Sequence, residues 1–73
     1  KLAFEEPQES EVFLAVMSLP RKYRTVIHLY YYEGYSAAEI GELMDLSTTA
    51  VTTRLLRGRK QLKEKLLEVW KDE

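Results

Sequence analysis

Cysteine is absent from this sequence, which excludes disulfide bonds, thiolate metal sites and thiol chemistry. Histidine occurs once, at His28, and no acid or nucleophile is placed near it by a known catalytic motif. We therefore predict that the chain is not an enzyme and that it holds neither a cofactor nor a metal. The lack of thiols fits a reducing cytoplasm, which is the expected location.

Long apolar runs are also missing, since no stretch approaches the roughly 20 residues that a membrane-spanning helix requires. The 73 residues suffice for one small domain. A domain of this size buries only about 60% of the surface that its unfolded chain exposes, so a deep catalytic cleft does not fit into it. Because 45% of the residues are hydrophobic, we expect a folded core and not a disordered chain.

Charge is nearly balanced over the chain, with a net charge of −1, but it is unevenly distributed. Residues 1–18 carry −3, from Lys1 against Glu5, Glu6, Glu9 and Glu11. Residues 47–65 carry +5, from Glu64 against Arg54, Arg57, Arg59, Lys60, Lys63 and Lys65. A single basic run is more often a solvated helix face than a binding surface, so neighbouring features must support a functional interpretation.

The first half of the chain predicts a linker end and two helices. Residues 1–9 are acidic and include Pro7, so we assign them to a linker and residues 10–73 to the domain. Ser10 is the predicted N-cap of a helix over about residues 11–18, with an inner face of Phe13, Val16 and Met17. Pro20 suits the start of a second helix, which should run to about Glu33 and end at a left-handed Gly34. The apolar arc of that helix comprises Tyr23, Val26, Ile27, Tyr30 and Tyr31.

The second half of the chain predicts a helix-turn-helix. Ser36 and Glu39 have the spacing of a capping box, and they begin a short helix with a buried side of Ile40, Leu43 and Met44. Asp45 and Leu46 form the turn, and Ser47 caps a fourth helix that runs to about Val69. A short capped helix, a tight turn and a longer helix are typical of this motif. The predicted fold class is therefore all-α, a small four-helix domain with a helix-turn-helix.

The fourth helix separates an apolar stripe from a polar face. At about 100° per residue, the stripe collects Val51, Leu55, Gly58, Leu62, Leu66 and Val69. A glycine in a helix interior costs about 1 kcal/mol relative to alanine, so Gly58 predicts the close approach of another backbone. The opposite side holds Thr49, Thr53, Leu56, Arg57 and Lys60, flanked by Thr52 and Arg59 on one side and by Arg54 on the other.

This polar face suits the major groove of DNA. Short hydroxyl side chains allow the helix to approach the groove floor, and arginines can fork onto guanine or bind phosphate. Leu56 lies in the middle of the face, where it is either an ordinary exposed leucine or a contact to thymine methyl groups and sugars. The amides of Ala37 and Ala38 at the start of the third helix suit a DNA phosphate, although a capped helix end alone would be an ordinary feature.

The residues from Leu19 to Leu62 resemble region 4 of bacterial RNA polymerase sigma factors, especially the extracytoplasmic-function (ECF) type. That family shows a leucine-proline start, an acidic-Gly-x-Ser step, a Glu-Ile-Ala helix and a recognition helix with the pattern Thr-Val-x-Ser-Arg-Leu-x-Arg-Ala-Arg. The matching segments here are LP at 19–20, EGYS at 33–36, EIG at 39–41 and AVTTRLLRGR at 50–59. No single motif is decisive, but the ordered set over about residues 10–66 is specific.

The resemblance implies binding of the −35 promoter element by the C-terminal domain of an alternative sigma factor, which docks on the flap of the polymerase β subunit. In such relatives the positions matching Thr52, Thr53, Leu56 and Arg57 face the bases, and those matching Ser36, Ala37, Arg54 and Arg59 lie near the DNA backbone. An anti-sigma factor is a further candidate partner. The full predicted DNA-binding set is Ser36, Ala37, Ser47, Thr48, Thr49, Thr52, Thr53, Arg54, Leu56, Arg57, Arg59 and Lys60.

The sequence departs from the family pattern at a few positions. Gly41 and Gly58 replace the usual alanines, Thr49 replaces a frequent glycine, and Thr52 stands where a lysine or arginine is common. The loss of that cation leads us to expect weak DNA binding by the isolated chain. Two alternatives stay open: the effector domain of another helix-turn-helix regulator, which usually dimerises through a terminal helix, and an interaction module that does not bind DNA.

Overall fold

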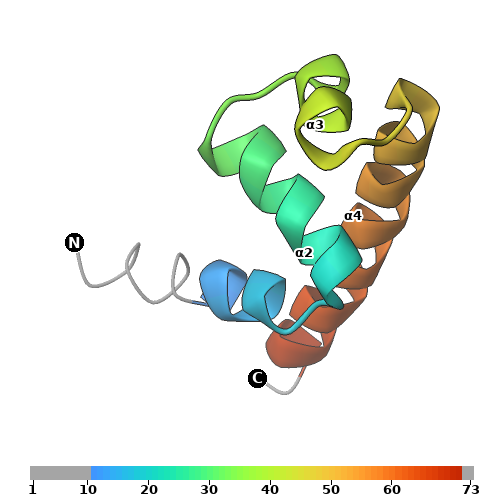
Figure 1. Cartoon of the computed structure of the whole chain (residues 1–73). Helices are drawn as coiled ribbons and strands as arrows, with labels where there is room; N and C mark the ends of the chain where they lie inside the picture. Colours follow the sequence, from blue (N-terminus) through green and yellow to red (C-terminus); the bar gives the residue numbers. More distant parts are fainter. Residues whose placement is uncertain (1–10, 72–73) are drawn as a thin grey trace.

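A computed structural model describes residues 11–71 of the chain, with side chains as far as residue 68. A helical segment over residues 11–17 precedes α2 (Arg21–Ile27), which continues directly into a π-helical turn, η1 (His28–Tyr32). The short helix α3 (Ala37–Met44) and the long helix α4 (Thr48–Lys71) follow, and no strand occurs among the described residues (Figure 1). The predicted all-α fold is confirmed. The predicted linker over residues 1–9 and the predicted cap at Ser10 lie outside the described residues.

The helices pack as a cradle around one side of α4. Both α2 and α3 contact α4, and α3 also contacts η1. In Figure 1, α3 lies beside the start of α4, while the segment over residues 11–17 lies near its C-terminal part. The long helix therefore has one side covered by the rest of the domain, and the remainder of its circumference is open to solvent.

Local hydrogen bonds fix the helix-turn-helix. Ser36 Oγ accepts a hydrogen bond from the Glu39 amide at 3.1 Å, and Glu39 Oε1 accepts one from the Ser36 amide at 2.8 Å. Asp45 ends α3 in the left-handed conformation, with φ 58° and ψ 47°. Ser47 Oγ then accepts a hydrogen bond from the Ala50 amide at 3.0 Å, which caps α4. The capping box, the turn and the second cap are all confirmed.

Gly41 permits the turn to close tightly. The Leu46 amide donates a hydrogen bond to the Gly41 carbonyl at 2.8 Å. A Cβ atom at position 41 would lie 2.5 Å from the Leu46 carbonyl oxygen, a backbone atom that cannot rotate away. The angle between α3 and α4 in this chain therefore depends on the missing side chain at this position.

The second predicted helix forms, but not as one continuous α-helix. The Glu33 amide donates to the His28 carbonyl at 3.1 Å, which is the five-residue spacing of a π-helix. Gly34 follows with φ 82°, the left-handed end that its position predicts. The wider turn shifts the direction of the side chains, so Tyr30 and Tyr31 are exposed and not part of the core, contrary to expectation. Leu29 packs against the core instead.

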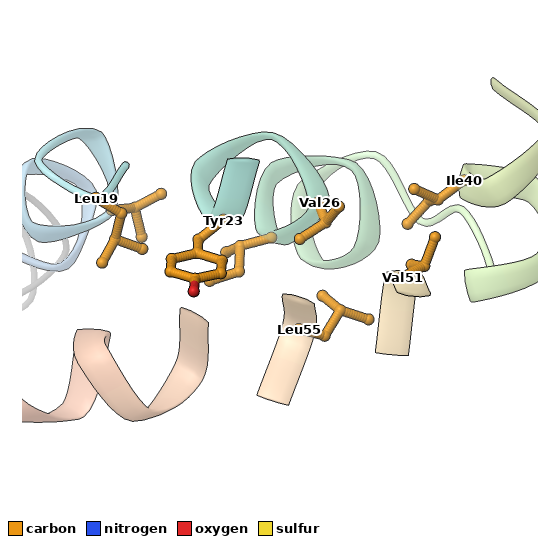
Figure 2. Packing of buried hydrophobic residues seen from close by; sticks show 8 residues of the cluster. Leu19, Tyr23, Val26, Ile40, Val51 and Leu55 are labelled. Carbon is orange, nitrogen blue, oxygen red and sulfur yellow. The ribbon is translucent and has the colours of Figure 1, made fainter. Parts of the chain in front are cut away.

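The core is a single cluster shared by all the helices. Val26, Ile27, Ile40 and Val51 are almost completely buried, and Figure 2 shows Leu19, Tyr23 and Leu55 packed along the same layer. On α4, Val51, Leu55 and Gly58 are buried, and Leu62 and Leu66 are half-buried. The predicted apolar stripe is confirmed along this length, and the side chain of Val69 lies outside the described residues.

Gly58 lies where α2 packs tightly against α4. A Cβ atom there would lie 2.8 Å from Ile27 Cδ1 and 3.1 Å from Tyr23 Cβ. A close contact is therefore present at this glycine, but the approaching atoms belong to side chains of α2 and not, as the sequence had predicted, to another backbone.

Besides Tyr30 and Tyr31, three more residues predicted to be buried are exposed. Phe13 and Met17 expose 51% and 46% of their surface, because the segment over residues 11–17 turns a different stripe inward, with Ala15, Val16 and the following Leu19. Leu43 exposes 60% of its surface. The short helix α3 presents only a narrow face to its neighbours, and that face is filled by Ile40 and Gly41.

Candidate nucleic-acid interface

The outward face of α4 carries most of the predicted DNA-binding residues. Thr49, Thr52, Leu56, Arg57 and Lys60 are exposed, as are Ser47 and Thr48 at the helix start, and Thr53 and Arg54 are half-buried. Val51, on the opposite side of the same helix, has no exposed surface. The structure therefore brings these side chains together on one continuous surface, with hydroxyl groups near the helix start and cations one to two turns later.

Hydroxyl groups at the start of α4 have defined hydrogen-bonding roles. Ser47 Oγ accepts from the Ala50 amide. Thr52 Oγ1 donates to the Thr49 carbonyl at 2.9 Å, so its proton is committed within the helix and its oxygen can still accept. In this conformation Thr52 can accept a hydrogen bond from an amino group at a base edge, such as N6 of adenine or N4 of cytosine.

The cations of α4 give this half of the molecule its positive charge. Arg57, Arg59, Lys60 and Lys63 are exposed, and Arg54 and Lys65 are half-buried. Among the described residues, neither Arg57 nor Lys60 forms an ion pair with a carboxylate. These two groups are therefore available for a phosphate or for a base edge in the major groove.

Arg59 lies apart from the rest of the predicted set. Its Nη1 donates a hydrogen bond to the Tyr31 hydroxyl of η1 at 2.7 Å. Arg59 also lines an apolar groove, together with Tyr31 and Leu62. The sequence did not predict this hydrogen bond. The only feature of the sequence that could have indicated it is the run of three tyrosines at 30–32, which offers hydroxyl groups near α4.

The start of α3 forms the second part of the predicted DNA-binding site. Ser36 is exposed and Ala37 is half-buried. The capping box occupies the Ser36 and Glu39 amides, whereas the first amides of a helix, here those of Ala37 and Ala38, have no partner within the helix itself. They carry the positive end of the helix dipole, which favours a bound anion.

His28 shows no catalytic arrangement. Its Nε2 lies 3.2 Å from Glu33 Oε2, and both side chains are about half exposed, at 52%. The imidazole also packs on the ring of Tyr32, with 5.4 Å between the two ring centroids. Within residues 11–68 no group of three or more His, Asp or Glu side chains could hold a metal ion, and no helix of the described part is long and apolar enough to cross a membrane.

Comparison with known proteins identifies the same segment. The family model described as "Sigma-70, region 4" matches residues 9–62. The ECF RNA polymerase sigma factor SigW of Bacillus subtilis (strain 168) is 43% identical over 54 residues, which cover 74% of this chain and 29% of that protein. The probable RNA polymerase sigma factor RfaY of Xanthomonas campestris pv. campestris is 37% identical over 62 residues, 84% of this chain and 16% of that protein. The chain spans less than a third of either relative.

Proposed function

This chain belongs to region 4 of the ECF-type sigma-70 family, and we propose that it binds the −35 element of promoter DNA as the C-terminal domain of an alternative sigma factor. In this role it directs RNA polymerase to its promoters. The observation that supports the proposal best is the outward face of α4, where hydroxyl groups, Leu56, Arg57 and Lys60 lie opposite a buried apolar stripe.

The residues of the interface divide into two proposed roles. Thr52, Thr53, Leu56 and Arg57 face the base edges in the major groove, since they lie on the outward side of α4. The groups that contact the DNA backbone are Ser36, Ala37, Ser47, Thr48, Thr49, Arg54, Arg59 and Lys60. Arg59 is expected to contribute least of that set to DNA binding, because its guanidinium already donates a hydrogen bond to Tyr31 of η1.

Contact with core RNA polymerase, through the flap of its β subunit, is the second part of the proposal. Its support is family membership, together with exposed apolar side chains such as Phe13, Leu14 and Met17. A direct test is titration of the isolated β flap onto the labelled domain, with Met17→Lys as the perturbed variant. No binding of the flap by the unmodified domain would remove this part of the proposal and leave the DNA part intact.

A salt titration tests the DNA-binding proposal. About four to six phosphate contacts predict that log Kobs falls with log[salt] with a slope of about −4 to −5. The measurement is fluorescence anisotropy of a labelled promoter duplex at several salt concentrations. A flat response to salt, or equal affinity for an uncharged polymer, would instead favour an interaction module that does not bind DNA.

The runner-up is the effector domain of another helix-turn-helix regulator. Such domains usually dimerise through a terminal helix. Sedimentation equilibrium of the domain, with and without DNA, separates the two: a stable dimer with no affinity for polymerase would favour the runner-up, and a monomer that binds polymerase would favour the sigma-factor role.

A further inference from the structure

An apolar groove of about 580 Å³ lies between the segment over residues 11–17, η1 and the C-terminal half of α4. It lies beyond the part of α4 that carries the recognition residues, and it is not part of the proposed DNA interface except for Arg59. Its walls are almost entirely apolar, formed mainly by Val12, Val16, Tyr31, Leu62, Leu66 and Leu67. Such a surface in a small domain calls for a specific occupant.

The rim of this apolar groove is cationic. Arg59 and Lys63 line it from α4, one turn apart. Tyr31 holds the Arg59 guanidinium at the rim through the 2.7 Å hydrogen bond, so this charge is fixed toward the groove. An occupant that matches both features is an extended segment with apolar side chains followed directly by carboxylates.

The chain itself contains such a segment. Residues 1–10 read KLAFEEPQES, with Leu2, Ala3 and Phe4 followed by Glu5 and Glu6. The segment joins the described structure at residue 11, next to Val12 in the groove wall. The six residues between Phe4 and Glu11 can span at most roughly 24 Å, which is enough to return to a groove that begins at the attachment point.

We propose that residues 2–6 fold back and occupy the apolar groove, with Leu2 and Phe4 against its walls and Glu5 and Glu6 facing Arg59 and Lys63. The tether keeps the segment at an effective concentration on the order of millimolar. A contact that would be weak between separate molecules is therefore populated within one chain. The occupied groove is unavailable to any other partner until that partner displaces the segment.

Paramagnetic relaxation in the intact chain tests this occupancy. The sequence has no cysteine, so Ala3→Cys provides a unique site for a nitroxide label. The expected result is strong broadening of the Leu62 and Leu66 methyl signals, with the Ile40 and Leu43 signals of α3 unaffected at the other end of the molecule (Figure 1). Adding Phe4→Ala should raise the dissociation constant of the segment from the groove about tenfold. The broadening of the Leu62 and Leu66 methyl signals should then fall about fivefold.

Two matched variants serve as controls. Leu14→Ala removes an exposed leucine that does not line the groove, so the broadening should stay unchanged. Lys63→Glu should reduce it, and the combination with Glu5→Lys and Glu6→Lys should restore it. Broadening that does not depend on Phe4 would overturn the proposal. So would broadening that appears only between a spin-labelled chain and a separate isotope-labelled chain, because a second copy would then be the occupant.

These outcomes can be distinguished from DNA binding, because Arg59 is the one residue named in both proposals. None of the substituted residues belongs to the proposed DNA interface, so the promoter-binding proposal and the groove proposal can fail separately. A titration of promoter DNA onto the Phe4→Ala chain should change the salt slope by no more than about one, the contribution of Arg59.

Discussion

Leu56 is a residue whose position packing does not explain. It exposes 63% of its surface on α4, between the hydroxyl groups near the helix start and the cations that follow. A leucine in solution gains nothing from this position, whereas in the major groove it could cover the methyl group of thymine. The proposed function gives this side chain a role, contact with thymine, that packing within the domain does not provide.

Replacing thymine by uracil in the target DNA isolates that contact. Loss of one buried methyl group is worth about 0.8 kcal/mol, so a duplex with uracil at the contacted position should bind about fourfold more weakly. Leu56→Ala should weaken binding to the thymine duplex and abolish the difference between the two duplexes. A uracil effect of the same size in the Leu56→Ala variant would show that another residue makes the contact, or that none does.

Arg57 and Arg59 differ in direction although only one residue separates them. Two positions along a helix correspond to about 200° around its axis. Arg57 lies on the exposed face, whereas Arg59 binds the Tyr31 hydroxyl. The same residue type is therefore expected to do different work at the two positions.

Alanine substitutions should separate these two roles. Arg57→Ala should relax sequence preference at one base pair, with a loss of about 1–3 kcal/mol of discrimination. Arg59→Ala should weaken all sequences about equally and reduce the salt slope by at most about one, because its guanidinium already binds Tyr31. Affinities for a panel of single-base promoter variants measure both, with Lys65→Ala as the control for a general loss of charge. Identical behaviour of Arg57→Ala and Arg59→Ala would refute the division of roles.

At the scale of elements, the angle between α3 and α4 determines whether the two parts of the interface can bind DNA together. That angle is set by the left-handed Asp45, the cap at Ser47 and the close contact between Gly41 and Leu46. Because the contact partner at position 41 is a backbone oxygen, a side chain there cannot be accommodated by a change of rotamer.

Gly41→Val should therefore destabilise the domain. Overpacking of this kind costs about 1–3 kcal/mol, and any remaining folded protein should bind promoter DNA more weakly because the turn has shifted. The control is Glu42→Val, which places the same side chain at the next, exposed position and should cost only about 0.5 kcal/mol through helix propensity. Chemical denaturation measures both. Equal stabilities for the two variants would mean that the turn is not closed in the way described.

The π-helical turn η1 is the element that the sequence did not predict. It ends α2 with a five-residue hydrogen bond between His28 and Glu33, and it presents Tyr31 to Arg59. Nothing in a run of tyrosines distinguishes a π-turn from an α-turn, since the difference is one hydrogen-bond register. Helical periodicity alone therefore could not predict that the Arg59 side chain is directed toward η1.

At the scale of the whole molecule, short-range signals were predictable and the packing of short helices was not. The caps at Ser36 and Ser47 and the turn at Asp45 depend on neighbouring residues, so the sequence contains all the information needed. The long helix α4 has enough turns for its apolar stripe to be assigned from the sequence without ambiguity. The segment over residues 11–17 has two comparable apolar stripes that share Val16. Only contact with the rest of the domain selects the one with Ala15 over the one with Phe13 and Met17.

The same reasoning applies to the proposed site. The outward face of α4 follows from periodicity, and the residues expected there are exposed or half-buried. The location of Arg59 and the apolar groove beside it depend on contacts between distant parts of the chain, such as Tyr31 with α4. The recognition helix could therefore be found in the sequence, and the groove could not.

Chemical-shift mapping tests the central claim most directly. The amide spectrum of the isotope-labelled chain is recorded during titration with a promoter duplex and, separately, with a scrambled duplex of equal length. The account predicts that the promoter duplex shifts the signals of Thr49, Thr53 and Arg57 and of the start of α3, with smaller shifts for the scrambled duplex. Shifts confined to other surfaces, such as Leu62 and the apolar groove, or no difference between the duplexes, would contradict it.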